Sequence, residues 1–315
     1  MTERVRLGAS DLRVFPLNLG GNTFGWTSDT RESHDVLDAY VAAGGNFVDT
    51  ADVYSAWVEG HVGGESETEL GSWLAARGDR DDLVIATKVA QHPEYKGLAE
   101  STVRAALEAS LRRLQTDYID LYYVHFDFPE VPIEEIASTF SALVDEGKIR
   151  HPAISNMKAD RIRAWMELAA AEGLHAPVAL QPLYNLMERG FEDEYGALAE
   201  EFGLSVLPYN AMARGFLTGK YREGTAIESA RAETGYKYLA MERGKRVLRA
   251  LDEVAGAHGV APGSVALAWL ASRPTVAAPI SSARTVEQLP MILASVDLRL
   301  TGEELSALDA ASAVP

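Results

Sequence analysis

The sequence predicts an α/β protein, a (β/α)8 TIM barrel over residues 1–315 with an N-terminal β-hairpin and a C-terminal extra helix. Short apolar runs alternate with amphipathic stretches from end to end. Several runs are almost continuously apolar, which is typical of parallel strands buried on both faces. Because about eight strand–helix units fill the chain, a closed barrel is favoured over an open doubly wound sheet. No linker or change of composition divides the chain, so we expect a single domain.

The expected strands follow from these apolar runs. The first is a short run over residues 16–19. Residues 4–16, which precede it, are expected to form a small hairpin that plugs the barrel floor. The remaining strands are expected at residues 46–49, 83–88, 119–125, 149–155, 178–181, 204–209 and 276–280.

Helical periodicity fills the gaps between the strands. Val36 and Tyr40 lie on one apolar face, and Asp29 and Glu32 before them occupy the positions of a capping box. Similar apolar stripes predict helices over residues 103–114, 133–144, 162–169 and 198–202, and a long helical region from residue 247.

Two loops and a final helix complete the expected elements. The final helix covers residues 301–311, with Thr301 as its N-cap and acidic residues in its first turn. Residues 55–65 are rich in glycine, and residues 216–240 are polar. Loops of this length in a compact barrel are usually functional or mobile.

The composition excludes several classes of site. The chain has no cysteine, which rules out disulfides, zinc–thiolate sites, iron–sulfur clusters and cysteine nucleophiles. Its net charge of −17 opposes binding to nucleic acid or to anionic membranes. The charged N-terminus shows no signal peptide, and no apolar run reaches the ~18 residues of a membrane helix. We therefore expect a cytoplasmic protein that acts on small molecules.

Polar residues end nearly every expected strand. Active sites of (β/α)8 barrels lie at the carboxyl ends of the strands, so these side chains should face one chamber. They are Asp49, Lys88, His125, Ser155, Asn156, Gln181, Tyr209, Ser281 and Ser282. An ordered ring of polar groups at this end predicts a reaction chamber.

Asp49, Tyr54, Lys88 and His125 form a set that suits the reduction of a carbonyl group. The ordinary pKa of tyrosine is about 10, and a neighbouring ammonium lowers the pKa of a phenol. We expect Lys88 to lower the pKa of Tyr54, and Asp49 to keep Lys88 charged and oriented. His125 is expected to donate a hydrogen bond to the carbonyl oxygen, which becomes negative during reduction. No side chain supplies a hydride, so a cofactor must do so.

Four segments resemble the signature of the aldo-keto reductase family, in the family's order and spacing and over nearly the whole chain. They are Phe47-Val48-Asp49-Thr50-Ala51-Asp52-Val53-Tyr54, Gly64-Glu65-Ser66-Glu67, Ala86-Thr87-Lys88-Val89 and Gly215-Phe216-Leu217-Thr218-Gly219-Lys220. The resemblance implies an NADPH-dependent reductase of the bacterial type that converts an aldehyde or ketone to an alcohol. The family's catalytic tetrad maps onto Asp49, Tyr54, Lys88 and His125, with Tyr54 as the general acid.

The same resemblance implies a nicotinamide cofactor that lies extended across the barrel mouth. Tyr209 would stack on the nicotinamide ring, and the loop after it would wrap the pyrophosphate. Arg284 would pair with a 2′-phosphate, because a guanidinium suits a bidentate phosphate contact, and this favours NADPH (NADP+) over NADH. The implied cofactor residues are Gly21, Thr23, Asp49, Ser155, Asn156, Gln181, Tyr209, Asn210, Met212, Arg214, Gly215, Leu217, Lys220, Ser282, Arg284 and Gln288.

Two segments depart from the family pattern. The family usually has a Ser-Pro-Leu-like run after the stacking tyrosine, where this chain has Asn210-Ala211-Met212. The family also usually has an acidic residue and an asparagine near the adenine, where this chain has Met291 and Ile292. We therefore expect different contacts at the turn and altered recognition of adenine.

Aromatic side chains beside the expected mouth predict an apolar substrate pocket, because ligand pockets are mostly apolar with a few placed polar groups. Trp26, Trp57 and Phe126 would form it together with Tyr54 and His125. Simple packing at the rim is the alternative. Trp57 lies in the long loop over residues 55–65, which we expect to close over the substrate.

The same residues have other interpretations. Asp49 and Lys88 would also suit a structural ion pair, and Lys88 a Schiff base as in barrel aldolases. His125 would suit a metal hydrolase, but such barrels need further histidine ligands on several strands. His151 begins its strand instead of ending it, and we expect His34, His92, His175 and His258 to be solvated, so no metal site is expected.

A further alternative is a binding function without fast chemistry. Some relatives of this fold are cofactor-binding subunits of membrane channels, so a low-turnover NADP(H)-binding regulatory subunit is the second hypothesis. Turnover of a simple aldehyde separates it from the reductase.

Overall fold

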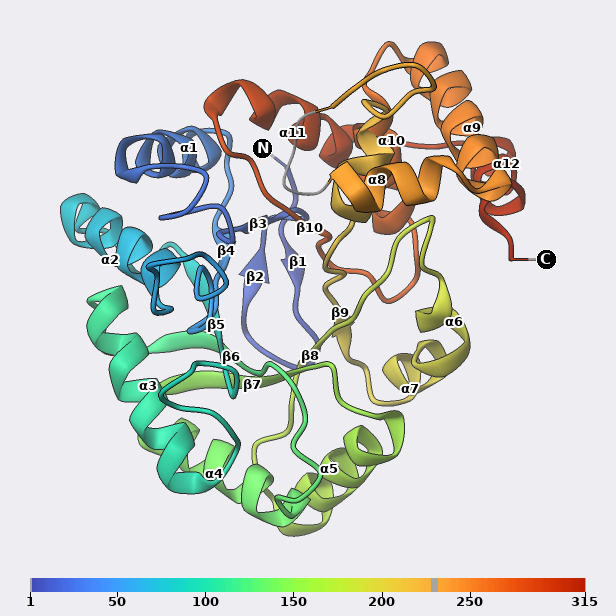
Figure 1. Ribbon diagram of the computed structural model, residues 1–315. Coiled ribbons are helices and arrows are strands. Elements are labelled where there is room, and N and C mark those ends of the chain that lie inside the picture. The colour runs from blue at the N-terminus through green and yellow to red at the C-terminus, as the bar shows by residue number, and fades with distance from the viewer. Residues whose placement is uncertain (1, 228–231, 315) are drawn as a thin grey trace.

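The computed structural model describes residues 2–227 and 232–314, and its strands form a ring surrounded by helices (Figure 1). Neighbouring strands are parallel, in the order β10-β3-β4-β5-β6-β7-β8-β9. Their bounds are β3 (Asn18–Gly20), β4 (Phe47–Asp49), β5 (Val84–Val89), β6 (Ile119–Val124), β7 (Ile149–Ser155), β8 (Ala179–Gln181), β9 (Ser205–Val206) and β10 (Ile280–Ser281).

Hydrogen bonds between β9 and the segment before β10 close the ring. The Val206 N–H donates to the Thr275 carbonyl at 2.8 Å, and the Ala277 N–H donates to the Val206 carbonyl at 3.0 Å. A closed ring leaves no edge strand unpaired. The predicted (β/α)8 barrel is therefore confirmed.

The last two strands are shorter than the sequence predicts. The expected strand over residues 204–209 pairs regularly only at Ser205–Val206, and the one over residues 276–280 is displaced to Ile280–Ser281. Each expected run contains a proline, Pro208 or Pro279, which has no N–H to donate to a ladder. These prolines explain the shortened ladders.

Most helices lie where the periodicity predicts, and the capping boxes of Asp29 with Glu32 and of Thr301 with Glu304 are both present. Four helices, α2, α6, α8 and α11, lie outside the helices that the sequence predicts. The helices are α1 (Thr30–Ala42), α2 (Glu65–Arg77), α3 (Glu100–Leu114), α4 (Ile133–Asp145), α5 (Ala159–Glu172), α6 (Gly190–Glu194), α7 (Gly196–Glu201), α8 (Ala232–Leu239), α9 (Glu242–His258), α10 (Pro262–Ala271), α11 (Leu289–Asp297) and α12 (Gly302–Ser312), with 3-10 turns η1 (Ala213–Thr218) and η2 (Val286–Gln288).

The strands separate two apolar cores. Along β6, Leu121 and Tyr123 face the barrel interior, whereas Tyr122 and Val124 pack against the surrounding helices. This alternation follows from the period of two along a strand. Both faces are covered, which explains why the strand sequences are apolar throughout.

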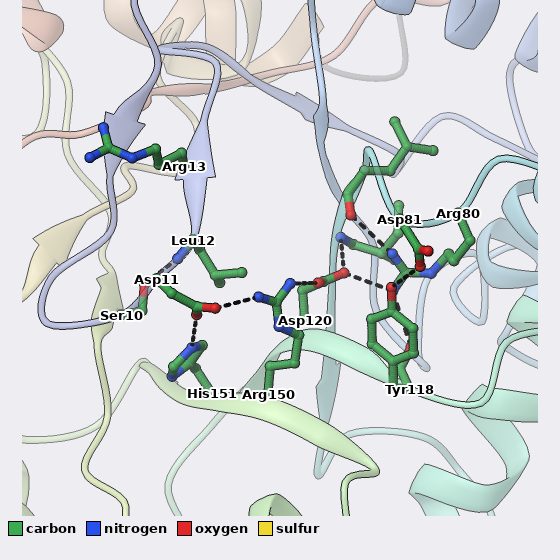
Figure 2. Close-up of polar contacts among 12 residues, drawn as sticks. Ser10, Asp11, Leu12, Arg13, Arg80, Asp81, Tyr118, Asp120, Arg150 and His151 are labelled. Atoms are coloured by element: carbon green, nitrogen blue, oxygen red, sulfur yellow. Dashed lines mark hydrogen bonds and ion pairs between the residues drawn. The ribbon is translucent and has the colours of Figure 1, made fainter.

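The N-terminal hairpin closes the barrel floor, as predicted. Its strands β1 (Val5–Arg6) and β2 (Arg13–Val14) are antiparallel. In its turn, Asp11 accepts hydrogen bonds from Arg150 at 2.7 Å and from His151 at 2.9 Å (Figure 2). Arg150 in turn donates to the buried Asp120 at 2.9 Å (Figure 2). This network attaches the hairpin to β6 and β7, at the end of the barrel opposite the expected site.

Two local expectations, the loop over residues 216–240 and the solvation of His92, need correction. The expected loop over residues 216–240 contains the end of η1 and helix α8, and its residues 228–231 lie outside the described residues. His92 was expected to be solvated, but its side chain is only 3% exposed. Its ring instead packs against Tyr95, with the ring centroids 5.2 Å apart.

Among the described residues, no single helix is long and apolar enough to cross a membrane. The pair α9 and α10 meets the criteria of length and composition only when taken together, and it is bent by 96°.

Candidate active site

Asp49 and Lys88 form a buried ion pair at the carboxyl ends of β4 and β5. The Lys88 Nζ lies 2.5 Å from the Asp49 Oδ2, and it also donates to the Thr50 carbonyl at 2.7 Å. The Lys88 side chain is 0% exposed, and the Asp49 side chain is 1% exposed. A buried ammonium is tolerable only with such partners, because desolvation of an unpaired charge is costly.

The Tyr54 hydroxyl contacts both members of this ion pair. It accepts a hydrogen bond from the Lys88 Nζ at 2.9 Å and lies 3.4 Å from the Asp49 Oδ2. Tyr54 lies on the loop after β4, just before Ser55, which has a left-handed φ of 76°.

His125 directly follows β6 and lies against the same phenol. The ring centroids of Tyr54 and His125 are 6.2 Å apart, in an edge-to-face arrangement. Burial, and secondarily the charge of Lys88, hold the pKa of His125 well below its ordinary value. The imidazole is therefore neutral at pH 7 and carries one N–H. Its Nδ1 has no hydrogen-bond partner among the described residues.

The direction of the pKa shift on Tyr54 corrects the sequence-based expectation. Lys88 was expected to lower the pKa of the phenol, but burial and the nearby Asp49 carboxylate raise it well above its ordinary value. The reason is that Asp49 neutralises the ammonium, so the pair presents little net positive charge to Tyr54. Burial also lowers the pKa of Lys88, against the opposing effect of Asp49. The phenol therefore holds its proton in this state of the protein.

A cavity opens at the barrel mouth next to the ion pair. Its wall includes four of the predicted cofactor residues, Ser155, Asn156, Gln181 and Tyr209. The Tyr209 hydroxyl donates to the Asn156 Oδ1 at 2.9 Å, and the Asn156 Nδ2 donates to the His125 carbonyl at 3.0 Å. The Gln181 Nε2 donates to the Asp49 Oδ1 at 2.9 Å. This bond uses one of the two N–H donors of the Gln181 amide, so its second N–H and its carboxamide oxygen are left to contact a ligand.

The turn after Tyr209 is strained. Asn210, Ala213 and Arg214 are not glycines, yet their φ angles are 53°, 47° and 56°. Such left-handed residues cost about 1–2 kcal/mol each for most side chains, and they cluster at ligand-binding sites. Arg214 lines the cavity with Asn210 and Met212, which gives this wall a cation in an acidic protein. A cation at a strained turn suits an anionic ligand such as a pyrophosphate.

Only some of the other predicted cofactor residues line this cavity. Ser282 lines the cavity. Leu217 is fully buried, and the same is true of Ile292, so neither side chain reaches a ligand. The predicted residues that do not line the main cavity are Gly21, Thr23, Gly215, Leu217, Lys220, Arg284 and Gln288.

Arg284 and Gln288 are nevertheless neighbours just after β10. The Gln288 Oε1 accepts a hydrogen bond from the Arg284 backbone N–H at 3.0 Å. The Arg284 side chain is exposed, which leaves its guanidinium accessible. Met291, one of the two departures from the family pattern, is half-buried and packs towards Gly263.

Two exposed aromatic side chains, Trp57 and Phe126, line the cavity, and a third aromatic ring, that of Trp26, packs against Trp57. Trp57 contacts Trp26 with ring centroids 5.5 Å apart, and Tyr54 with centroids 6.0 Å apart. Trp57 is 52% exposed, and Phe126, whose ring lies 5.1 Å from that of His125, is 42% exposed. Trp26 itself does not line the cavity. Exposed aromatic rings beside a polar cavity suit an apolar ligand.

The cavity has a volume of about 430 Å³ and includes residues that the sequence analysis missed. Asn22 is the clearest of them, because its Oδ1 accepts a hydrogen bond from the Ser282 hydroxyl at 2.7 Å. The signal was its position in a glycine-rich run directly after the first strand. Further missed lining residues are Gly20, Ala211 and Ile280.

A comparison with protein families matches residues 16–313 to the model of the aldo/keto reductase family. The chain belongs to the aldo/keto reductase family. It is 32% identical to "Protein tas" of Escherichia coli strain K12, with 97% of this chain and 96% of that protein covered. It is 33% identical to norsolorinic acid reductase B of Aspergillus parasiticus, with 96% and 81% covered. It is also 33% identical to a probable voltage-gated potassium channel subunit beta of Oryza sativa subsp. japonica, with 96% and 94% covered.

Membership of the aldo/keto reductase family decides the class of chemistry. The chain is an oxidoreductase of carbonyl compounds, and the family generally uses NADP(H). The tetrad predicted from the sequence is assembled at the carboxyl end of the barrel, where this fold places its active sites.

Proposed function

We propose that this protein reduces an aldehyde or a ketone to an alcohol with hydride from NADPH, and that Tyr54 is the general acid. The observation that carries the proposal is the contact of 2.9 Å between the Tyr54 hydroxyl and the Lys88 Nζ, at the wall of an open cavity. Asp49 holds the same ammonium at 2.5 Å. The result is a proton donor whose conjugate base has a fixed cation beside it.

The raised pKa of Tyr54 is compatible with this role. A bound nicotinamide cofactor supplies the hydride. As the carbonyl oxygen gains negative charge, the proton on Tyr54 passes to it, and Lys88 stabilises the phenolate that remains. The transfer is favourable because an alkoxide is a strong base. Its basicity resembles that of hydroxide, and the pKa of water, the conjugate acid of hydroxide, is about 16.

His125 has a separate role in this scheme. A neutral imidazole can donate one hydrogen bond to the carbonyl oxygen without competing with Tyr54 as a proton source. Its low pKa keeps it neutral, and its ring lies 6.2 Å from that of Tyr54, with both side chains lining the same cavity. We therefore assign His125 to the orientation of the substrate.

The residues of the cavity fit the nicotinamide cofactor that we propose. Tyr209 offers a ring for stacking, Asn156 and Gln181 offer amide groups, and Arg214 offers a cation at the strained turn. The exposed guanidinium of Arg284 is the group that we assign to a 2′-phosphate, which favours NADPH over NADH. Trp57 and Phe126 would contact the apolar part of the substrate.

The direct test is a panel of aldehydes and ketones assayed with NADPH and with NADH. We expect oxidation of NADPH, followed at the nicotinamide absorbance, with a higher kcat/KM for carbonyls that carry an aromatic or apolar group. The same assay after treatment with a chelator should show unchanged turnover. An enzyme that binds NADPH but reduces no carbonyl of the panel would contradict the proposal.

A second candidate is a low-turnover, cofactor-binding regulatory subunit. Two relatives named as potassium channel beta subunits, from Oryza sativa and from Schizosaccharomyces pombe, are each 33% identical to this chain. Tight binding of NADP(H) with single-turnover reduction but no multiple turnover would favour this candidate.

A further inference from the structure

A second cavity lies at the barrel floor, at the opposite end of the barrel from the active site. It has a volume of about 560 Å³ and lies between the N-terminal hairpin and helices α10 and α11. This is within the range of roughly 300–1,000 Å³ that is usual for small-molecule sites. Much of its lining is apolar, from Pro16, Ala268, Val276, Val296, Leu298 and Leu300.

Four arginines line this cavity: Arg4, Arg6, Arg13 and Arg299. Arg6 lies directly opposite Arg13 in the hairpin register, and Arg4, two residues before Arg6, belongs to the same face. Like charges directly opposite each other destabilise a strand pair. No carboxylate offsets this repulsion. Glu3 is the acidic side chain of the described lining, and it forms no ion pair with any of the four arginines.

The contacts of these arginines do not neutralise their charge. Arg6 donates to the Ser10 carbonyl at 2.5 Å, and Arg299 donates to the Val296 carbonyl at 2.8 Å. Within residues 2–227 and 232–314, none of the four guanidinium groups lies within 4.0 Å of a carboxylate. Figure 2 shows the Arg13 side chain pointing away from the carboxylate network that holds the other part of the hairpin.

This local excess of positive charge is unusual for a chain with a net charge of −17. Carboxylates are abundant on such a surface, yet the four arginines gather around an apolar hollow without one. A guanidinium pairs well with a carboxylate or a phosphate, and an apolar wall favours a hydrocarbon group next to that anion. The volume suits a small molecule more than a protein surface.

We infer that the barrel-floor cavity binds a small organic anion with an apolar body, its carboxylate or phosphate held by the arginines of the hairpin. The inference is independent of the proposed function, because the cavity and the active site share no residue. Octanoate and octyl phosphate are suitable probes, with acetate and inorganic phosphate as the matching anions without the apolar body.

The test is calorimetric titration of the full-length protein at low ionic strength, with NADP+ present at saturation to fill the barrel mouth. We expect one octanoate or octyl phosphate per chain, and binding of acetate and inorganic phosphate at least about tenfold weaker. Added salt should weaken the binding, because exposed guanidinium groups are screened. The relative affinities of the two octyl compounds tell whether the site prefers carboxylate or phosphate.

The double variant Arg4→Gln/Arg13→Gln should weaken octanoate binding by at least about tenfold. The matched control is Arg112→Gln/Arg249→Gln, which removes two exposed arginines of α3 and α9 and should bind octanoate like the wild type. Carbonyl reduction should be unchanged in both double variants. These four residues lie outside the active site.

A variant that fills the cavity gives a second, independent readout. Ala271 lines the cavity at the end of α10 and is exposed, so Ala271→Trp should fold normally and block octanoate. Three results would overturn the inference: no binding of either octyl compound, equal binding by Arg4→Gln/Arg13→Gln and the wild type, or equal affinity for octanoate and acetate. Failure of carbonyl reduction in the wild type would instead concern the proposed function alone.

Discussion

Replacement of Tyr54 by phenylalanine isolates the proposed proton donor. The change removes one oxygen atom and retains the ring that contacts His125 and Trp57. In the variant, Lys88 keeps two acceptors, the Asp49 carboxylate at 2.5 Å and the Thr50 carbonyl at 2.7 Å. The lost hydrogen bond is worth about 0.5–1.5 kcal/mol of folding stability. That is small against the 5–15 kcal/mol typical of a folded protein, so the variant stays folded.

The effect on catalysis should be much larger than the effect on stability. A positioned general acid contributes roughly 10²- to 10⁴-fold, which corresponds to about 3–5 kcal/mol of transition-state stabilisation. We expect kcat of Tyr54→Phe to fall by this factor, with the Kd for NADPH within about twofold of the wild type. Steady-state turnover at the nicotinamide absorbance and a fluorescence titration measure the two quantities.

Tyr122→Phe is the matched control for this experiment. Tyr122 is also buried and lies on β6, but it faces the helices, and its hydroxyl has no hydrogen-bond partner among the described residues. Its loss should leave turnover unchanged. If Tyr54→Phe kept kcat within about tenfold of the wild type, or if Tyr122→Phe lost as much activity, Tyr54 would not be the general acid.

Three further predictions concern stability, pH and the cofactor. Lys88→Met leaves the Asp49 carboxylate buried without its cation and should lower the free energy of unfolding by about 3–5 kcal/mol in urea denaturation. Unchanged stability would mean that the pair does not carry buried charges. The pKa of His125 is held well below its ordinary value of 6.5, so below that pH only the unfolded chain takes up this proton. The wild type should therefore lose about 1 kcal/mol more stability than His125→Asn between about pH 7.5 and 5.5, and equal losses would argue for a solvated imidazole. Arg284→Ala should weaken binding of NADPH by about tenfold and leave binding of NADH nearly unchanged; equal losses for both would remove the assignment to the 2′-phosphate.

The sequence by itself determined the architecture and most of the site. Apolar runs buried on both faces, with helical stripes between them, allow few arrangements other than a closed parallel barrel. Once the barrel is known, polar residues at the carboxyl ends of the strands are expected at the chamber, and Asp49, Ser155 and Gln181 do line the cavity, with Lys88 buried against Asp49. Such inferences succeed because they depend only on local periodicity and on a rule of the fold.

Tertiary structure alone decided the electrostatics and the second cavity. The pKa of Tyr54 depends on burial and on the distance from Asp49 to Lys88, and a sequence contains neither quantity. The unpaired arginines of the barrel floor became visible only when the hairpin placed Arg13 opposite Arg6, beside the end of α10. Desolvation and Coulomb energies depend on three-dimensional distances between residues far apart in the chain, which the pattern of residue types does not record.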